Sequence, residues 1–485
     1  MRILMATSEL FPFSKTGGLA DMVAGLSGAL AEAGHEVRVI TPLYRGIREK
    51  FPALELLDWQ CELPMADAWV RAQVWSSSTA KGVQIYFVDQ PDYFGRAQLY
   101  QENGLGYADN PERFIFFSKC VTHLARYLPW RADILHLHDW QAAMVPLLIR
   151  DQTARDHWAN PPRTCLTIHN LAYQGTCPAD QFRLANLPQN QFNLGGAEFY
   201  GLFNPLKAGL AYADWLTTVS PSYSQEILSS EMGVGLHGVL QDRRQALTGI
   251  LNGVDYTEWN TQNNPHLRHS YSAVNLEGKA ANKLLLQQEL GLLQAADVPL
   301  FASITRLAEQ KGLHIMHDAL QAHLSARFQF VLLGSGDPGI EALFLQMARH
   351  HPGRAAVRIG YDNALSHRIE AGADFFLMPS RYEPCGLNQL YSLRYGTIPI
   401  VRATGGLKDS VVDIDPKSNG TGITFDKYAP DALSAAIDRS CKLYGNKTAL
   451  RDTMSRGMAA DFSWQASAAK YAELFEKLSS QGPPS

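Results

Sequence analysis

The sequence predicts an α/β protein with two Rossmann-like domains, each built on a doubly wound parallel sheet with helices on both faces. The first observation is length, because 485 residues exceed what one hydrophobic core usually supports. The second is that short apolar runs alternate with helical patterns, which is typical of parallel strands joined by crossover helices. The third is that this alternation starts again near residue 248. Ligands bind at the carboxyl ends of such strands, so we expect the two halves to face a cleft.

The amino-terminal half opens with a predicted strand–helix–strand unit. Ile3–Thr7 is a short apolar run, and a loop leads from it to Gly17 and Gly18. The next apolar residues repeat at helical spacing until Gly34, and Val37–Thr41 is again an apolar run. Further strands of this half are predicted at Gln84–Val88, Ile134–Leu137, Cys165–Ile168 and Leu216–Val219.

The carboxyl-terminal half repeats this pattern. Strands are predicted at Leu300–Ile304, Phe328–Leu333, Val357–Gly360, Phe375–Met378 and Ile398–Val401. Helices are predicted at Leu313–Leu324, Ile340–His350 and Gly386–Tyr395. Because helices separate the apolar runs, this half also predicts a parallel sheet. The tail 481–485 is expected to be frayed.

Composition argues against several classes of function. The formal charge of −4 disfavours a protein that binds nucleic acid through its overall field. The six cysteines form no C-x-x-C pair, which predicts free thiols in a reducing compartment and no zinc site. No apolar stretch approaches the roughly 20 residues of a membrane span, and no signal-like region is present at the amino terminus. We therefore expect a cytoplasmic protein without a membrane partner.

Glycine turns with nearby cations are the first candidate binding sites. Lys15-Thr-Gly-Gly18 lies between the first predicted strand and helix, where backbone N–H groups can approach an anion and Lys15 adds charge. It matches neither the P-loop nor the dinucleotide G-x-G-x-x-G pattern, and a solvated turn is the alternative. Arg306 and Lys311 occupy the equivalent turn of the second half. There they either neutralise a diphosphate or form surface ion pairs.

A carboxylate lies in a further turn of the second half. Glu383 follows the predicted strand Phe375–Met378, and the backbone N–H groups of Gly386 and Leu387 are predicted to face an anion. Glu383 is placed to accept hydrogen bonds from sugar hydroxyls or to face a developing positive charge. The alternative is a carboxylate that merely favours the helix dipole. Thr404-Gly-Gly406 offers another glycine turn at a strand end.

Two segments superficially resemble metal sites. His136-Leu-His-Asp139 lacks partners at ligand spacing, and Asp413-Ile-Asp415 follows a predicted helix and does not end a strand. Neither therefore predicts a metal. His169 and Asn170 end the predicted strand Cys165–Ile168, where ligand-facing residues belong, although a structural histidine is the alternative.

A series of longer motifs runs in order along nearly the whole chain. The motifs are Ser8–Pro12, Lys15–Asp21, His136–Trp140, Thr167–Gly175, Phe203–Gly209, Thr218–Ser222, Ile250–Asp255, Thr305–Gly312, Pro379–Leu387, Thr404–Leu407 and Asp461–Trp464. Together they closely resemble the bacterial glycogen synthases and plant starch synthases, glycosyltransferase family 5.

The resemblance implies a GT-B fold, in which two Rossmann-like domains face a cleft. The implied domains are 1–247 on the acceptor side and 248–462 on the nucleotide-sugar side, with a helix over 463–480 that crosses back. The implied reaction transfers glucose from ADP-glucose to the non-reducing 4-hydroxyl of an α-1,4-glucan, glycogen or starch, with retention. No metal or other cofactor is implied. A mature plant-type chain would act in the plastid stroma and not in the cytoplasm.

The resemblance also implies roles for single residues. The implied catalytic residues are His169, Asp139, Glu383, Arg306 and Lys311, the last two binding the diphosphate. The implied donor-binding residues are Lys15, Gly17, Gly18, Asp21, Asn170, Asn252, Cys385, Gly386, Leu387, Thr404, Gly405 and Gly406. The residue that deprotonates the acceptor stays open, as do the donor base, the primer requirement, regulation and the oligomeric state.

A departure and a loosely matching stretch bear on the acceptor. Many two-Rossmann glycosyltransferases, sucrose synthase among them, carry Glu-x7-Glu, whereas Tyr391 stands eight positions after Glu383. This favours a glucan synthase over a transferase that uses sucrose, a lipid or a small glycoside. An inactive glucan-binding protein is a further alternative. Tyr93, Phe94 and Tyr100 are expected to stack on glucan rings, with loop packing as the alternative.

Overall fold

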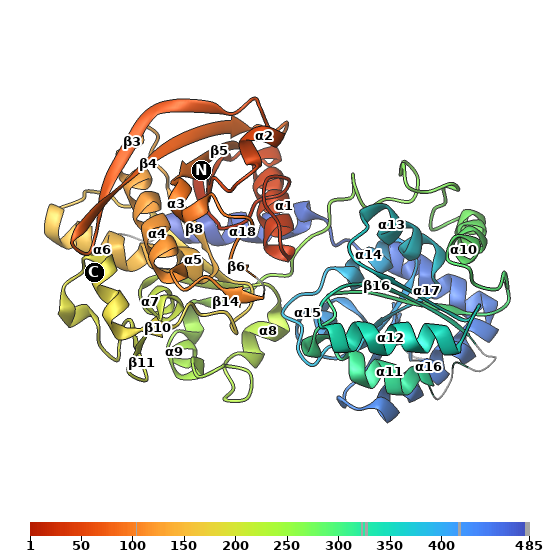
Figure 1. The fold of residues 1–485 in the computed structure, drawn as a ribbon. Helices are drawn as coiled ribbons and strands as arrows, with labels where there is room; N and C mark the ends of the chain where they lie inside the picture. The colour runs from red at the N-terminus through yellow and green to blue at the C-terminus, as the bar shows by residue number, and fades with distance from the viewer. Residues whose placement is uncertain (103, 322–323, 325–327, 416–418, 481–485) are drawn as a thin grey trace. The chain divides into compact units, whose positions relative to one another are not determined.

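Two compact units make up the chain in the computed structural model, which describes residues 1–102, 104–321, 324, 328–415 and 419–480. The first unit runs from Met1 to Gly253 and contains the segment that begins at Trp464; the second runs from Val254 to Ser463 (Figure 1). The predicted boundary after residue 247 falls inside β14 (Leu247–Gly249), which pairs with β13 (Trp215–Thr218). The first unit therefore extends further than predicted. The tail 481–485 lies outside the described residues.

The first unit is built on a nine-stranded sheet with the order β14-β13-β9-β8-β1-β2-β5-β4-β3. The strands that run parallel are β1 (Arg2–Ala6), β2 (Glu36–Pro42), β5 (Gln84–Asp89), β8 (Ile134–His138), β9 (Arg163–Ile168), β13 and β14. The predicted parallel sheet is confirmed. The hairpin of β3 (Glu55–Met65) and β4 (Ala68–Ser78) adds two antiparallel edge strands that the sequence did not predict. Most of β3 is not fully buried, so its apolar pattern is weak.

Helix α1 (Gly18–Glu32) shows why the first unit includes the end of the chain. Its predicted apolar stripe is buried, and it packs against α18 (Trp464–Ser480). The approach is close, because a β-carbon on Gly25 would lie 2.0 Å from Nε1 of Trp464. The ring of Trp464 is buried in the core of the first unit. Within the described residues, the other α-helices of this unit are α2 (Ile47–Lys50), α3 (Pro91–Phe94), α4 (Asn110–Tyr127), α5 (Asp139–Ala142), α6 (Val145–Asp156), α7 (Pro205–Tyr212), α8 (Pro221–Glu226) and α9 (His237–Asp242).

Short strands lie outside the main sheet of the first unit. They are β6 (Gln101–Glu102), β7 (Leu105–Gly106), β10 (Cys177–Pro178), β11 (Glu198–Phe199) and β12 (Leu202–Phe203). Strands β11 and β12 form an antiparallel hairpin, with Phe199 opposite Leu202. A two-residue turn therefore joins them.

The second unit contains a six-stranded parallel sheet with the order β17-β16-β15-β18-β19-β20. The strands are β15 (Leu300–Ile304), β16 (Gln329–Gly334), β17 (Ala355–Ile359), β18 (Phe375–Met378), β19 (Ile398–Arg402) and β20 (Ile423–Phe425). Helices α11 (Leu313–Gln321), α12 (Pro338–His350) and α16 (Pro430–Gly445) lie on one face, and α10 (Glu277–Glu289), α13 (Asn363–Gly372) and α14 (Asn388–Arg394) lie on the other (Figure 1). The short α15 (Gly405–Ser410) and α17 (Lys447–Ala459) complete the unit. The doubly wound prediction is confirmed for this half.

Two predicted helices of the second unit have different bounds in the structure. Helix α14 begins at Asn388, two residues after the predicted start, because Gly386 has a φ of +73°, outside the helical region. Helix α11 ends at Gln321, and residues 322–323 of the predicted helix lie outside the described residues.

Each sheet has one position where the order of its strands reverses direction. In the first unit this position lies between β1 and β8, and in the second it lies between β15 and β18. Loops that leave two such neighbouring strands turn to opposite faces of the sheet, which opens a crevice at their carboxyl ends. The fold thus marks one crevice in each unit where a ligand is expected.

Candidate active site

Predicted side chains lie at the switch point of each unit. In the first unit, Lys15 and Asp139 follow β1 and β8, and His169 follows the neighbouring β9. In the second unit, Lys311 and Glu383 follow β15 and β18. The sheet topology therefore brings together, within each unit, residues that are far apart in the sequence.

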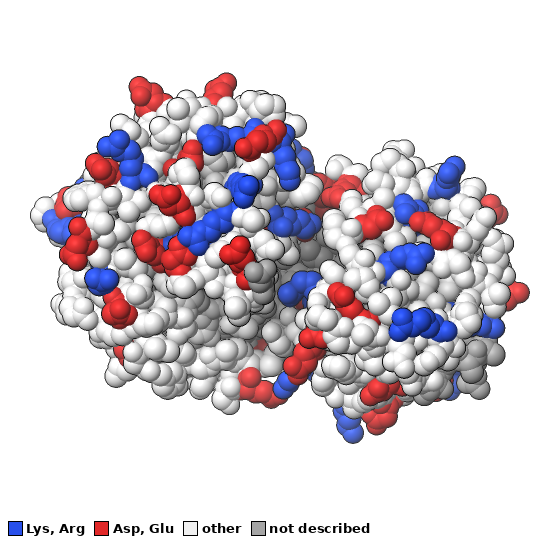
Figure 2. All heavy atoms as spheres, viewed as in Figure 1, with Lys and Arg blue, Asp and Glu red and all other residues white. Residues whose placement is uncertain are grey.

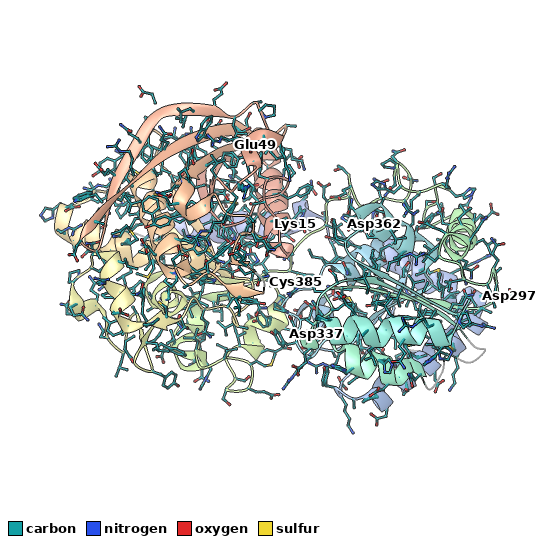
Figure 3. The ribbon with its side chains drawn as sticks, in the orientation of Figure 1. Lys15, Glu49, Asp297, Asp337, Asp362 and Cys385 are labelled. Carbon is teal, nitrogen blue, oxygen red and sulfur yellow. The ribbon has the colours of Figure 1, made fainter. Side chains whose placement is uncertain are left out.

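Lys15 lies in the loop that precedes α1 (Figure 3) and is exposed. Its Nζ is 2.8 Å from Oδ1 of Asp21, on the first turn of α1. Burial raises the pKa of Asp21, and the Lys15 charge opposes that rise. The ion pair holds the ammonium group near the start of the helix, where the helix dipole also favours an anion.

Glu9 is a residue at this site that the sequence analysis missed. It is buried, and its Oε2 accepts hydrogen bonds from the backbone N–H groups of Thr16 at 2.6 Å and Gly17 at 3.3 Å. The Gly17 amide therefore contacts a carboxylate of the protein itself, and its contact with the donor stays a prediction. The sequence feature that could have identified Glu9 is its position, three residues after the first strand. Ligand-facing residues lie at the carboxyl ends of parallel strands, and acidic residues are seldom buried without a role.

The three aromatic residues predicted to stack on glucan are held inside the first unit. Phe94 is fully buried and Tyr93 is 8% exposed, so neither ring face is open to a sugar. Tyr100 donates its hydroxyl to Oε1 of Glu9 at 2.9 Å, and this hydroxyl lies 2.7 Å from Oγ of Ser8. The prediction is wrong for Tyr93 and Phe94, which pack in the core. Tyr100 instead orients the Glu9 carboxylate through its hydrogen bond.

Asp139 combines an unusual backbone with a perturbed carboxyl group. Its φ is +57°, a left-handed conformation that is uncommon outside glycine. Its Oδ1 accepts a hydrogen bond from the His169 backbone N–H at 2.7 Å. Burial raises the pKa of Asp139 to about 7, although the backbone N–H groups of His169 and Asn170 lower it. The carboxyl group thus ties the ends of β8 and β9 together and titrates near neutral pH.

Three histidines lie close together: His136 and His138 are on β8, and His169 directly follows β9. Nδ1 of His138 is 3.1 Å from Nε2 of His169, and Nε2 of His136 is 2.6 Å from the hydroxyl of Thr167. Burial lowers the pKa of His136 and His169 to about 3 and that of His138 well below its usual value. All three imidazoles are therefore neutral near pH 7. His169 presents an uncharged ring that can share a proton but carries no charge to a phosphate.

These buried groups predict how the stability of the first unit depends on pH. Each histidine has a folded-state pKa below its unfolded value near 6.5. At mildly acidic pH each histidine therefore gains a proton when the protein unfolds, so acid favours the unfolded state. Asp139 opposes the trend, because its raised pKa makes the folded state bind a proton first. On unfolding, the three histidines gain three protons and Asp139 loses one, so the protein takes up two protons in total. We expect the melting temperature to fall steadily as the pH is lowered from about 6.5 to 4.

Differential scanning calorimetry across this pH range measures the effect. The His136→Asn variant lacks one of the three histidines, so its melting temperature should fall less steeply with pH than that of the unaltered protein. A melting temperature that is constant between pH 6.5 and 5 in the unaltered protein would contradict the neutral histidine cluster.

The second unit places two cations and a carboxylate at its switch point. Nζ of Lys311 is 2.7 Å from Oε2 of Glu383, which also accepts a hydrogen bond from Ser380 at 2.9 Å. Arg306 follows β15, is exposed, and makes no side-chain hydrogen bond or ion pair within the described part of the chain. The pair Lys311–Glu383 is nearly buried, whereas Arg306 remains open to an anionic ligand.

Glycines allow the loops around Glu383 to lie close together. A β-carbon on Gly405 would lie 2.0 Å from the carbonyl oxygen of Glu383, and one on Gly406 would lie 2.1 Å from that of Cys385. The Gly406 N–H donates to the carbonyl oxygens of Glu383 and Pro384, at 3.1 and 3.2 Å. This amide is therefore hydrogen-bonded within the protein, and a role of Gly406 in donor binding stays a prediction. The turn fixes the backbone that carries Glu383.

The remaining predicted donor-binding residues differ in accessibility. Cys385 (Figure 3) and Thr404 are buried, whereas Gly386 and Leu387 are partly exposed beside Glu383. Asn252 is buried in the first unit, close to its end, and its Oδ1 makes no hydrogen bond within the described residues. A buried amide oxygen without a hydrogen-bond partner is unfavourable. Asn252 is therefore a candidate to accept a hydrogen bond from a ligand.

Tyr361 is an aromatic candidate that the sequence analysis did not single out. It follows β17, on the same carboxyl edge of the sheet as Arg306 and Glu383, and is 80% exposed. Neighbouring Asp362 (Figure 3) caps α13 by accepting from the Leu365 N–H at 2.8 Å. An exposed ring anchored at a strand end is suited to stack on a planar or ring-shaped ligand. Its signal in the sequence was a tyrosine directly after the predicted strand Val357–Gly360.

The segments that resembled metal sites are engaged in other contacts. Oδ2 of Asp413 is 2.6 Å from Nη2 of Arg439, and its Oδ1 accepts a hydrogen bond from the Thr424 N–H. Over the ranges that the structure describes, no three His, Cys, Asp or Glu residues are grouped to hold a metal. In the same ranges, no helix has the length and apolar character needed to cross a bilayer.

Comparisons with known proteins match nearly the whole chain. The starch synthase catalytic domain family matches residues 2–242, and the glycosyl transferases group 1 family matches residues 292–455. Glycogen synthase of Anaeromyxobacter dehalogenans is 47% identical, with 99% of both chains covered. Glycogen synthase of Syntrophotalea carbinolica is 45% identical, with 98% of this chain and 99% of its own covered. The catalytic domain of starch synthase IV from Arabidopsis thaliana, solved with ADP and acarbose, is similar with a TM-score of 0.89 at 35% identity, covering 99% of both chains.

Two parallel α/β units with cations and a carboxylate at their switch points define a glycosyltransferase of the GT-B fold class. The relatives narrow this class further. The chain belongs to the family of glycogen synthases and starch synthases.

Proposed function

We propose that the protein is an ADP-glucose-dependent glycogen synthase. It transfers glucose to the non-reducing 4-hydroxyl of an α-1,4-glucan with retention and releases ADP. The observation that carries the proposal is the full-length similarity to a starch synthase catalytic domain solved with ADP and acarbose. The Lys311–Glu383 pair at the switch point of the second unit supports it, because it places positive charge beside a carboxylate suited to a sugar.

Cations of both units are assigned to the donor in this proposal. Arg306 and Lys311 stabilise the negative charge that develops on the diphosphate when the glucosyl bond breaks. Lys15 adds a third positive charge from the first unit. Tyr361 offers its exposed ring face to the adenine base. The reaction then needs no resident cofactor, and a cytoplasmic location suits the free thiols of all six cysteines.

Glu383 is assigned a positioning and stabilising role. Its bonds to Lys311 and Ser380 hold the carboxylate in one orientation, from which it can accept hydrogen bonds from glucose hydroxyls. The same charge favours an oxocarbenium-like transition state. The acceptor hydroxyl attacks the face of the sugar that the diphosphate leaves, so the configuration at the anomeric carbon is retained without a glucosyl-enzyme.

Separate assays with ADP-glucose and UDP-glucose test the proposed function. Each nucleotide sugar is supplied with glycogen, and both nucleotide release and polymer growth are measured. We expect ADP release to match glucose incorporation into glycogen. Transfer to sucrose, a lipid or a small glycoside in an acceptor panel, in preference to glycogen, would overturn the assignment of the acceptor. Glycogen binding without any transfer would identify an inactive glucan-binding protein.

Replacing Lys15 tests the contribution of the first unit to donor use. We expect Lys15→Ala to lower kcat/KM for ADP-glucose by about 10- to 100-fold, because one charge-assisted contact to the diphosphate is lost. The matched control is Lys81→Ala, since Lys81 also pairs with a carboxylate of α1, Glu32, at 3.1 Å. Equal kcat/KM in a well-folded Lys15→Ala protein would remove Lys15 from the donor site.

A further inference from the structure

Two turns of the first unit hold non-glycine residues in a left-handed backbone conformation. Between β11 and β12, Tyr200 has a φ of +51° and Gly201 one of +81°. In the loop before α9, Val234 has a φ of +46° and Gly235 one of +80°. A hairpin turn with two positive φ angles favours Asn, Asp or Gly at its first position. A left-handed backbone is unfavourable for tyrosine and still more so for β-branched valine.

These two turns lie against each other and expose their side chains. A β-carbon on Gly235 would lie 2.9 Å from Cζ of Phe199 and 3.8 Å from Cε2 of Tyr200. The rings of Phe199 and Tyr200 meet edge to face at 4.7 Å. Tyr200 is 81% exposed and Val234 is 48% exposed. The unfavourable backbone therefore accompanies an apolar surface formed by Phe199, Tyr200 and Val234, which we call the aromatic ledge.

A buried glutamine connects the aromatic ledge to the loop that carries His169. Nε2 of Gln174 donates to the carbonyl oxygen of Val234 at 3.0 Å and to that of Leu171 at 3.1 Å. Its Oε1 accepts a hydrogen bond at 2.8 Å from Asn204, which directly follows β12. One side chain thus fixes both turns relative to the loop after β9. A rigid surface that continues from a predicted catalytic loop is suited to a ligand longer than one sugar.

The residues around the aromatic ledge favour a neutral ligand rich in hydroxyl groups. The segment Gln189–Leu202 contains four amide side chains and one charged residue, Glu198, which accepts from the Gly201 N–H at 2.6 Å. The lower part of the first unit, where β10, β11 and α9 lie in Figure 1, shows few charged side chains in Figure 2. Aromatic faces stack on the C–H faces of sugars, and amides pair with hydroxyls. The segment contains no Lys or Arg, and the Lys207 ammonium, which donates to the carbonyl oxygens of Leu194 and Glu198, is buried. This disfavours a phosphate or nucleic acid as the ligand.

We propose that the aromatic ledge binds the α-glucan chain beyond the sugars that react. It holds a polymeric acceptor such as glycogen, while the reacting end lies at the predicted catalytic loops. This inference rests on the proposed function for the identity of the glucan. It predicts that the ledge sets the affinity for glycogen more than the rate of the chemical step.

The Tyr200→Asn variant tests the proposal, because asparagine suits the turn but lacks the ring. Glycogen affinity is measured without nucleotide sugar, by electrophoresis in gels containing glycogen. We expect the dissociation constant to rise about 10-fold and the KM for glycogen to rise in parallel, with kcat changed less. The melting temperature should rise by about 2–4 °C, because the left-handed turn becomes more favourable. Tyr200→Trp retains a ring and should keep affinity within about 3-fold.

The control is Tyr127→Ala, which removes a tyrosine that is 56% exposed at the end of α4. It should change neither glycogen affinity nor KM. Unchanged affinity in a folded Tyr200→Asn protein would overturn the proposal. Light scattering offers a second outcome against the proposal. If Tyr200→Asn disrupts a dimer and leaves glycogen affinity unchanged, then a second copy of the chain, and not glycogen, covers the ledge. If the unaltered protein binds glycogen but transfers no glucose, the proposed function fails and the ledge assignment stands.

Discussion

Replacing Glu383 by glutamine is expected to lower kcat by roughly 30- to 1,000-fold, which corresponds to about 2–4 kcal/mol of transition-state stabilisation. Glutamine keeps much of the hydrogen bonding to sugar hydroxyls but removes the negative charge that faces the developing oxocarbenium centre. It also leaves Lys311, 2.7 Å away, without its charged partner. Steady-state kinetics with ADP-glucose and glycogen measure the loss. Glu309→Gln is the matched control, because Glu309 is an exposed carboxylate of the same unit, paired with Arg381 at 3.4 Å.

The role of Glu383 also has a chemical test. Rapid quenching during turnover, followed by peptide mass spectrometry, detects a sugar bound covalently to the Glu383 peptide. We expect no adduct, because the acceptor attacks from the side of the leaving diphosphate. An adduct that forms and decays at the turnover rate would show that Glu383 is a nucleophile, and would replace the front-face mechanism by double displacement.

Arg306→Ala is expected to lower kcat by about 100-fold or more. Arg306 is exposed at the end of β15 and has no partner among the described residues, so its charge is available to the diphosphate as the glucosyl bond breaks. Excess EDTA should leave the rate unchanged, since the cations of the protein supply this charge. Arg368→Ala is the matched control, because Arg368 lies in the same unit and pairs with Glu289 at 2.8 Å.

The opposite result with EDTA would point to a metal. If EDTA abolishes transfer and Mg²⁺ or Mn²⁺ restores it, the positive charge comes from a bound cation and the assignment of Arg306 is wrong. Asp413 and Asp415 would then become candidate ligands. In the structure Asp413 is paired with Arg439 at 2.6 Å, so metal binding there would first have to break this ion pair.

The fold could be predicted where burial dictates the residue type. Strands β15, β16 and β18 are buried, so they appear in the sequence as continuous apolar runs. The hairpin β3–β4 could not be found in this way, because it lies at the edge of the sheet and exposes much of its surface. The boundary at residue 247 was wrong for a related reason. Strand β14 has three residues, and its pairing with β13 depends on a contact between distant segments.

The candidate site could be predicted from the position of residues at strand ends. Parallel strands gather their carboxyl ends at one edge, so Lys311 and Glu383 meet although 72 residues separate them. Partners that depend on three-dimensional contacts could not be inferred. Glu9 occupies the Gly17 amide, and the Gly406 amide is used by the loop of Glu383. Phe94 lies in a loop-rich aromatic stretch, where burial leaves no periodic pattern to follow.

The return of α18 to the first unit makes the second unit an inserted domain. Its two ends meet, because the Val254 N–H donates to the carbonyl oxygen of Phe462 at 2.7 Å. During synthesis, residues 254–463 can therefore complete their sheet while the first unit still lacks the helix that carries Trp464. The apolar surface of α1 around Gly25 then stays open until α18 leaves the ribosome. Adjacent ends also make the junction at 253/254 and 463/464 a natural place to excise or exchange this domain.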